Sequence, residues 1–128
     1  WQALRQPLRQ CRLGLVASGG IYQVGQVAFH HKDDTSFRVI PTDVKTADVR
    51  VTHFAYDLTD ARQDPNVVFP LDTLRGLVSE GVLGSLAAQA YTFMGGIYSA
   101  RRVQEDLAPA LTACLLNEGV DAVLFVPV

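Results

Sequence analysis

Two short apolar runs, residues 12–17 and 121–126, constrain the fold of this chain more than any other feature. Each run is too short for a typical buried helix and reaches a glycine or a proline within a few residues, so we predict two buried strands. A continuous apolar strand is typical of a parallel sheet that helices cover on both faces. The residues between the two runs must then supply further strands and the connecting helices.

Two helices are predicted between these runs. Pro70 opens the first helix, because its fixed φ suits the first helical turn, and Gly81 is suited to end it. The second helix spans about residues 99–117 and is followed by Gly119. Pro109 lies inside this second helix, so we expect a kink or a new helical start there.

Three further segments complete the predicted sheet. Residues 36–40 alternate in polarity and predict a short edge strand, and residues 48–54 alternate too and predict a second strand. Residues 82–90 carry few charges and suit a buried strand, whereas residues 21–34 show no clear period and are predicted as a loop. This order predicts an α/β fold with three layers, a mostly parallel sheet with helices on both faces.

The composition excludes several functional classes. The 128 residues fit one domain, and a net charge of −2 without a basic cluster argues against nucleic acid as a partner. No apolar run approaches the roughly 18–20 residues that a membrane-spanning helix needs, and no signal peptide is evident. The apolar content of 48% is high for a small monomer and favours a surface that faces a partner, as in a homo-oligomer.

The chain has two cysteines, Cys11 and Cys114. They form neither a disulfide framework nor a metal motif, and they favour a reducing, cytoplasmic location. Cys114 falls on an apolar helical stripe and nothing near Cys11 would lower its pKa, so neither is predicted to be a nucleophile. No metal site is predicted either, because the adjacent His30 and His31 are interpreted as exposed loop residues.

Both ends of the chain look cut. Residue 1 is tryptophan rather than methionine, and the apolar run over residues 121–128 stops without a turn or a polar tail. We therefore expect the functional polypeptide to continue beyond Val128.

A ligand site is predicted at the strand ends, because ligands of an open parallel sheet bind beyond the carboxyl ends of its strands. The candidates are Ser18, Gly19 and Gly20 after the first strand, His53, Tyr56 and Asp57 after the second, and Tyr91, Met94, Gly95 and Gly96 after the third.

Each of these three groups also has a structural interpretation. Residues 18–20 could cradle an anion with backbone N–H groups, or form a tight turn that needs positive φ. His53 with Tyr56 and Asp57 could form an acid–base group, or His53 could be a hydrogen-bonded residue at a strand end. Residues 91–96 could line an aromatic pocket, or pack in the core before a loop.

Several longer blocks of the sequence resemble one known family. They are residues 14–20 (GLVASGG), 36–41 (SFRVIP), 66–75 (NVVFPLDTLR), 80–81 (EG), 91–96 (YTFMGG) and 118–124 (EGVDAVL). Together they resemble the selenoprotein B family, the B-type subunits of glycine, sarcosine, betaine and D-proline reductases. The resemblance covers nearly the whole chain, from about Leu13 to Val128.

The resemblance implies an oxidoreductase subunit that reductively cleaves a C–N bond of a small amino acid or its derivative. In this family a selenocysteine or cysteine attacks the carbon next to the carboxylate and displaces the nitrogen, and a nearby cysteine resolves the adduct. The resemblance also implies companion subunits, a thiol electron donor, and a pyruvoyl group on a companion subunit that activates the amine. No cofactor is expected in this chain itself.

The resemblance also bears on the site. In the D-proline reductase type the redox motif directly follows the strand that matches residues 121–128, so the catalytic Cys or selenocysteine is expected just after Val128. From their positions, residues 18–20 would surround the substrate carboxylate, His53 and Tyr56 would handle hydrogen bonds or protons, and residues 91–96 would form a pocket wall. The competing hypothesis is a non-catalytic ligand-binding or assembly subunit of the same fold.

Overall fold

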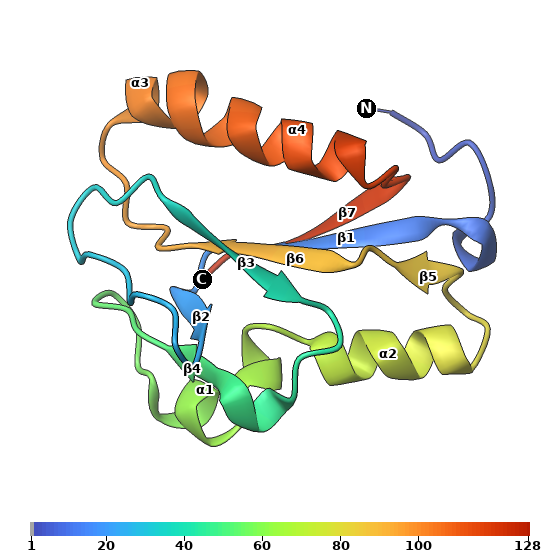
Figure 1. Ribbon diagram of the computed structural model, residues 1–128, viewed down its shortest axis with the longest axis horizontal. Coiled ribbons are helices and arrows are strands. Elements are labelled where there is room, and N and C mark those ends of the chain that lie inside the picture. The colour runs from blue at the N-terminus through green and yellow to red at the C-terminus, as the bar shows by residue number, and fades with distance from the viewer. Residues whose placement is uncertain (1) are drawn as a thin grey trace.

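The computed structural model describes residues 2–128 and has a mixed β-sheet at its centre (Figure 1). The central strand pairs in parallel with three others; the four are β1 (Arg12–Ala17), β5 (Ser85–Leu86), β6 (Gln89–Phe93) and β7 (Ala122–Val126). β3 (Phe37–Pro41) adds to β6 in antiparallel orientation, so the predicted edge strand is confirmed. The chain is an α/β protein, as predicted, with one antiparallel strand in an otherwise parallel sheet.

β1 is central because it has neighbours along both of its edges. β7 pairs along one edge, while β5 pairs with the beginning and β6 with the end of the other edge. The prediction of one strand over residues 82–90 is therefore wrong, because two strands share this edge. Thr42 stabilises the break between β5 and β6. Its hydroxyl donates to the Ala87 carbonyl at 2.6 Å, and its N–H donates to the Ala88 carbonyl at 2.9 Å.

Both predicted helices are present. α2 (Leu71–Ser79) is followed by Gly81, which has a φ of +72°. The second helix is a continuous succession of α3 (Ala100–Arg102), a π-helical turn η4 (Val103–Leu107) and α4 (Ala108–Asn117). The helix widens into the π-turn just before Pro109, which has no N–H to donate to the preceding turn. The distortion expected at Pro109 thus takes the form of a local widening.

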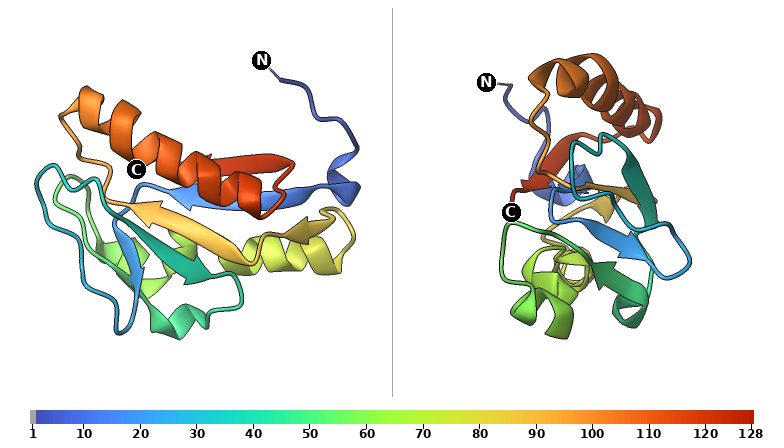
Figure 2. Two further views of the ribbon diagram at one scale, coloured as in Figure 1. Left: turned by 45° about the horizontal axis from the view of Figure 1, so that its top comes forward. Right: turned by 90° about the vertical axis from the view of Figure 1, so that its left-hand side faces the viewer.

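Side chains of β1 alternate between two apolar clusters. Leu15 and Ala17 belong to one cluster, together with Leu71 and Leu74 of α2. Val16 belongs to the other cluster, which includes residues of η4 and packs against residues of α4. The sheet therefore contacts α2 through one set of its side chains and α4 through the other set (Figure 2).

A second, two-stranded antiparallel sheet consists of β2 (Ile21–Gln23) and β4 (Val49–Val51). The loop predicted over residues 21–34 is thus wrong at its start, and the strand predicted over residues 48–54 is shorter and lies outside the main sheet. The reason is pairing between distant segments, because Ile21 is fully buried and pairs with Val51. Sequence periodicity does not report such a partner.

Short helices connect these parts. They are η1 (Leu8–Gln10), η2 (Thr46–Asp48), α1 (Thr59–Gln63) and η3 (Pro65–Val67). α1 and η3 lie beside β4, where the chain passes from the small sheet to α2. Within residues 2–128, every helix is too short or too polar to span a bilayer.

Candidate functional site

The ends of β1, β4, β6 and β7 meet around Gly20. The Ser18 N–H donates to the Val126 carbonyl at 3.1 Å, and the Gly20 N–H donates to the Phe93 carbonyl at 3.1 Å. The Thr52 N–H in turn donates to the Gly20 carbonyl at 3.0 Å. These bonds connect the end of β1 to both neighbouring strands and to the small sheet.

Gly20 turns the chain away from the main sheet and has a φ of +66°. A Cβ added at Gly20 would lie 1.7 Å from the Thr52 carbonyl oxygen, so the close approach requires glycine. This geometry agrees with the tight-turn interpretation of residues 18–20. The N–H groups of Ser18 and Gly20 are already bonded, so among these three residues only the Gly19 N–H lacks a hydrogen bond within residues 2–128.

His53 lies two residues after the end of β4 and points toward the residues that follow β6. The Ala55 N–H donates to His53 Nδ1 at 3.0 Å, so the neutral imidazole carries its proton on Nε2. Nε2 is buried and has no hydrogen-bond partner within residues 2–128. It lies 3.4 Å from the position that a Cβ of Gly95 would take. The ring also packs against Phe54 and Tyr56, with centroids 5.2 and 4.8 Å away.

Burial lowers the pKa of His53 below its usual value of 6.5, and a polar contact with the Met94 backbone, which falls short of hydrogen-bond geometry, partly offsets this shift. Because the unfolded chain then binds the proton more readily than the folded chain, stability should fall as the pH drops below 6.5 toward the folded pKa. We expect the wild type to lose more stability than His53→Gln between about pH 7.5 and about pH 5.5. Urea unfolding of both proteins at the two pH values measures this, and equal losses would contradict it.

Tyr56 and Val128 close the site from two sides. The Tyr56 hydroxyl donates to the Gly19 carbonyl at 3.0 Å, and burial raises the pKa of this hydroxyl. The Val128 N–H donates to the Ser18 hydroxyl oxygen at 3.0 Å. Ser18 therefore accepts one hydrogen bond and keeps its own hydroxyl proton available.

Three residues after β6 complete the arrangement. Met94 is 2% exposed, and its sulfur lies 3.3 Å from the position of a Gly20 Cβ. Gly95 lies against Ser18 and His53, and Gly96 lies against the Phe54 ring. The structure thus gathers eight of the predicted residues in one place. We call them the strand-end cluster: Ser18, Gly19, Gly20, His53, Tyr56, Met94, Gly95 and Gly96.

Two predicted residues lie elsewhere. Tyr91 is inside β6 rather than after it, is 4% exposed, and packs in the cluster with η4, where its hydroxyl donates to Glu118. Burial and the Glu118 carboxylate raise the pKa of Tyr91. Asp57 is exposed and accepts hydrogen bonds from the Thr59 N–H and hydroxyl, which lowers the pKa of Asp57. Asp57 thus forms an Asx turn that leads into α1, whose N-cap residue is Leu58.

The two cysteines are free and lie outside the strand-end cluster. Cys11 precedes β1, at the opposite end of that strand, and Cys114 belongs to α4. His30 and His31 stack on each other with centroids 4.6 Å apart. Within residues 2–128, no three His, Cys, Asp or Glu side chains gather in a way that could hold a metal ion.

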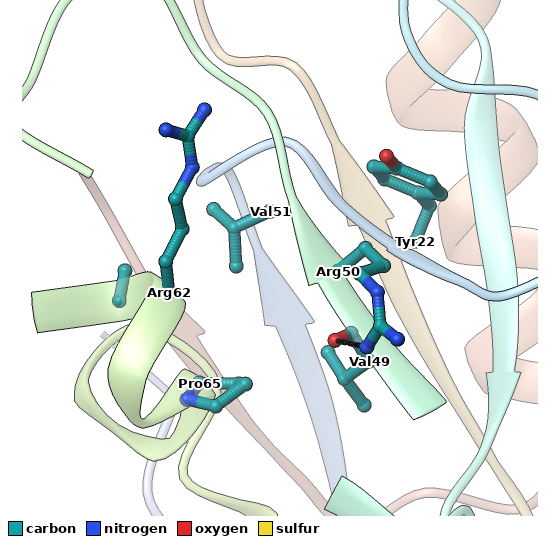
Figure 3. A pocket seen from close by; sticks show the side chains of 7 residues that line it. Tyr22, Val49, Arg50, Val51, Arg62 and Pro65 are labelled. Carbon is teal, nitrogen blue, oxygen red and sulfur yellow. Dashed lines mark hydrogen bonds between the residues drawn. The ribbon is translucent and has the colours of Figure 1, made fainter. Parts of the chain in front are cut away.

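One hollow borders the strand-end cluster, and a second, larger cavity lies beside β4. A small apolar hollow of about 90 Å³ is bordered by Ser18, Phe93, Phe125, Val126 and Pro127. Phe93 lies within residues 91–96, which the sequence suggested as a possible pocket lining, whereas sequence reasoning missed Phe125 on β7. A larger cavity of about 350 Å³ lies between the small sheet and α1 (Figure 3); its wall consists of Tyr22, Val49, Arg50, Val51, Ala61, Arg62 and Pro65.

Comparison with known sequences decides the family. The sequence model of the glycine/sarcosine/betaine reductase selenoprotein B family matches residues 3–127. The chain belongs to this family. The resemblance found from the sequence blocks is therefore confirmed, and the chain can be compared with its curated relatives.

D-proline reductase subunit gamma of Acetoanaerobium sticklandii is 36% identical over 124 residues, which cover 97% of this chain and 51% of that protein. Glycine reductase complex component B subunit gamma of Symbiobacterium thermophilum is 33% identical over 112 residues, which cover 78% of this chain and 26% of that protein. The chain thus spans about half, or less, of the length of these relatives. No solved structure matches it.

Proposed function

We propose that this chain forms the substrate-binding part of a reductase-complex subunit that cleaves a C–N bond of a small amino acid or its derivative. Relatives in the family are named as subunits of D-proline reductase and of glycine reductase. The observation that carries the proposal is the buried Nε2 of His53, which has no partner within residues 2–128. An unpartnered buried donor is costly to stability, and a bound substrate would satisfy it.

In the proposed site, each polar group of the strand-end cluster has a separate task. His53 Nε2–H donates a hydrogen bond to the substrate, and its lowered pKa keeps the imidazole neutral near pH 7. The Ser18 hydroxyl donates its free proton at the mouth of the apolar hollow. Phe93 and Phe125 cover the carbon skeleton of the substrate and exclude water from it.

The proposal assigns the redox step to groups outside residues 2–128. A cysteine or selenocysteine after Val128 provides the nucleophile, and a pyruvoyl group on a companion subunit, when present, activates the amine. The placement of Cys11 and Cys114 away from the cluster supports this division. A thiol electron donor, a cytoplasmic location and a homo-oligomer belong to the same proposal, as does a three-layer frame, which the two separate apolar clusters support.

Ligand binding tests the proposal. Calorimetric titration of the chain, alone and with its companion subunits, should detect binding of at least one of D-proline, glycine, sarcosine and betaine. His53→Gln should weaken this binding about 3- to 10-fold, because one hydrogen bond to the substrate is lost or distorted. His31→Gln is the matched control, since His31 is exposed and outside the cluster, and it should leave the affinity unchanged.

Two results would contradict the proposal: a wild type that binds none of the four compounds, or a His53→Gln variant that binds as tightly as the wild type. Turnover separates the catalytic from the non-catalytic alternative. With the full-length polypeptide, its companion subunits and a dithiol present, binding without C–N cleavage would favour the non-catalytic role. Mass spectrometry of the substrate pool measures that cleavage.

A further inference from the structure

Arg62 borders the larger cavity and belongs to α1, next to the strand-end cluster. The cavity of about 350 Å³ is lined by Arg62 of α1 together with Val49 and Val51 of β4. Figure 3 shows the Arg62 side chain rising past Val51, away from Pro65 and away from Arg50. β4 runs from Val49 to Val51 and is followed by Thr52 and His53, so the Arg62 guanidinium extends toward the end of β4 that leads into the cluster.

The guanidinium of Arg62 has no protein partner in the part of the chain that the structure describes. Arg75 and Arg101 form ion pairs with Asp72 and Glu105. Arg50, on the other side of the same cavity, donates to the carbonyls of Ala47 and Val49 at 2.7 and 2.8 Å. Arg62 makes neither kind of contact within residues 2–128, so all five of its N–H groups are available to a ligand.

Arg62 also acts electrostatically on the cluster. Its positive charge favours the ionised Tyr56 hydroxyl and thereby opposes the rise in the pKa of Tyr56 that burial causes. The same hydroxyl donates to the Gly19 carbonyl at 3.0 Å, so Tyr56 connects the region of Arg62 to the turn at the end of β1. The geometry agrees, because Arg62 and Val51 line the same cavity and Val51 is the last residue of β4, two residues before His53.

The strand-end cluster itself has no permanent positive charge. Its side chains are those of serine, glycine, methionine, tyrosine and a histidine whose lowered pKa keeps it neutral near pH 7. The backbone N–H groups of Ser18 and Gly20 donate within the protein. A carboxylate brought to this cluster would therefore lack the cation that buried or half-buried carboxylates require.

We propose that Arg62 supplies this cation and binds the carboxylate of the substrate at the rim of the strand-end cluster. This inference rests on the proposed function and adds a specificity-determining residue to it. A guanidinium donates two parallel hydrogen bonds to a carboxylate, which fixes the orientation of the ligand as well as its charge. Arg62 thereby selects ligands with a free carboxylate over those in which this group is an uncharged amide.

Paired ligands test the inference. Calorimetric titration should compare D-proline with D-prolinamide, and glycine with glycinamide, on the chain alone and with its companion subunits. We expect the wild type to bind each acid at least about 10-fold more tightly than its amide, as for a hydrogen-bonded charge pair. Arg62→Gln should weaken binding of the acids about 10-fold and leave binding of the amides unchanged. Arg62→Lys keeps the positive charge but cannot donate two parallel hydrogen bonds, so it should bind the acids more tightly than Arg62→Gln and less tightly than the wild type.

Arg50→Gln is the matched control, because Arg50 borders the same cavity but already donates to two carbonyls. It should not change the preference for acids over amides. If Arg62→Gln binds the acids as the wild type does, or if Arg50→Gln lowers their affinity equally, Arg62 is not the carboxylate ligand and the proposed function still stands. If the wild type binds neither acids nor amides, the proposed function fails and the role of Arg62 fails with it. Thermal unfolding of Arg62→Gln should match the wild type, because its side chain is exposed.

Discussion

Replacing Gly20 with alanine should lower the free energy of unfolding by roughly 3–5 kcal/mol, which is large for a single methyl group. The added Cβ would lie 1.7 Å from the Thr52 carbonyl oxygen and 2.9 Å from its carbon, so the backbone of β4 would have to move. The φ of +66° at Gly20 adds the strain of a conformation that L-residues rarely adopt. Both hydrogen bonds of Gly20, to Phe93 and from Thr52, depend on this geometry.

Gly25→Ala is the control that separates the cost of the steric clash with Thr52 from the cost of the positive φ. Gly25 also has a positive φ, +94°, but a Cβ there would meet nothing within 4 Å. This variant should cost only about 1–2 kcal/mol, the strain of the backbone alone. Urea unfolding of the two variants measures the difference, and equal losses would show that the approach of Thr52 to Gly20 is not essential to the fold.

The sequence predicts those parts of the fold that depend on local patterns of residues. The strands at residues 12–17 and 121–126 and the two helices depend on local patterns of apolar residues, and each was found within a few residues of its bounds. The small sheet depends on β2 and β4 meeting across a long segment, after the turn at Gly20. No local pattern in residues 21–34 reports that meeting, so this segment was predicted as a loop.

The site shows the same division. The rule that ligands bind at strand ends brought together the six residues that follow β1 and β6, because these two strands are parallel neighbours that end at one edge. His53 and Tyr56 join them by another route, since β4 lies in the small antiparallel sheet and the Thr52 N–H bonds to Gly20. Tyr91 was misplaced because the end of β6 was predicted three residues too early, and a strand residue points to a face rather than to an edge. Asp57 was misplaced because a carboxylate two residues before a threonine also suits an Asx turn that leads into a helix.

Arg62 shows a limit of another kind. It lies on the short helix α1, and no motif marks it in the sequence. Only the three-dimensional structure suggests Arg62 as a carboxylate ligand. The observations are the cavity beside β4, the absence of a protein partner within residues 2–128, and the influence of Arg62 on Tyr56. Charged residues that bind ligands from a neighbouring element are therefore the part of a site that one sequence reveals least.

Gly95→Ala should destabilise the protein by roughly 2–4 kcal/mol and also disturb the site. The added Cβ would lie 2.7 Å from the Ser18 carbonyl oxygen and 3.4 Å from His53 Nε2, at a φ of +87°. The methyl group would occupy space next to the one buried donor that the proposed substrate satisfies. We therefore expect the Gly95→Ala variant to lose ligand binding under conditions in which it is still folded.

Gly81→Ala is the control for Gly95→Ala, because Gly81 has a φ of +72° and a Cβ there meets nothing within 4 Å. It should cost about 1–2 kcal/mol and leave ligand binding intact, since it lies after α2 and outside the strand-end cluster. Urea unfolding and calorimetric titration of both variants separate strain from obstruction. If Gly95→Ala loses no more stability than Gly81→Ala and still binds ligand, the space between Ser18, Gly95 and His53 is not where the substrate is held. If it loses binding while Gly81→Ala retains it, the close packing at Gly95 is a condition of the site as well as of the fold.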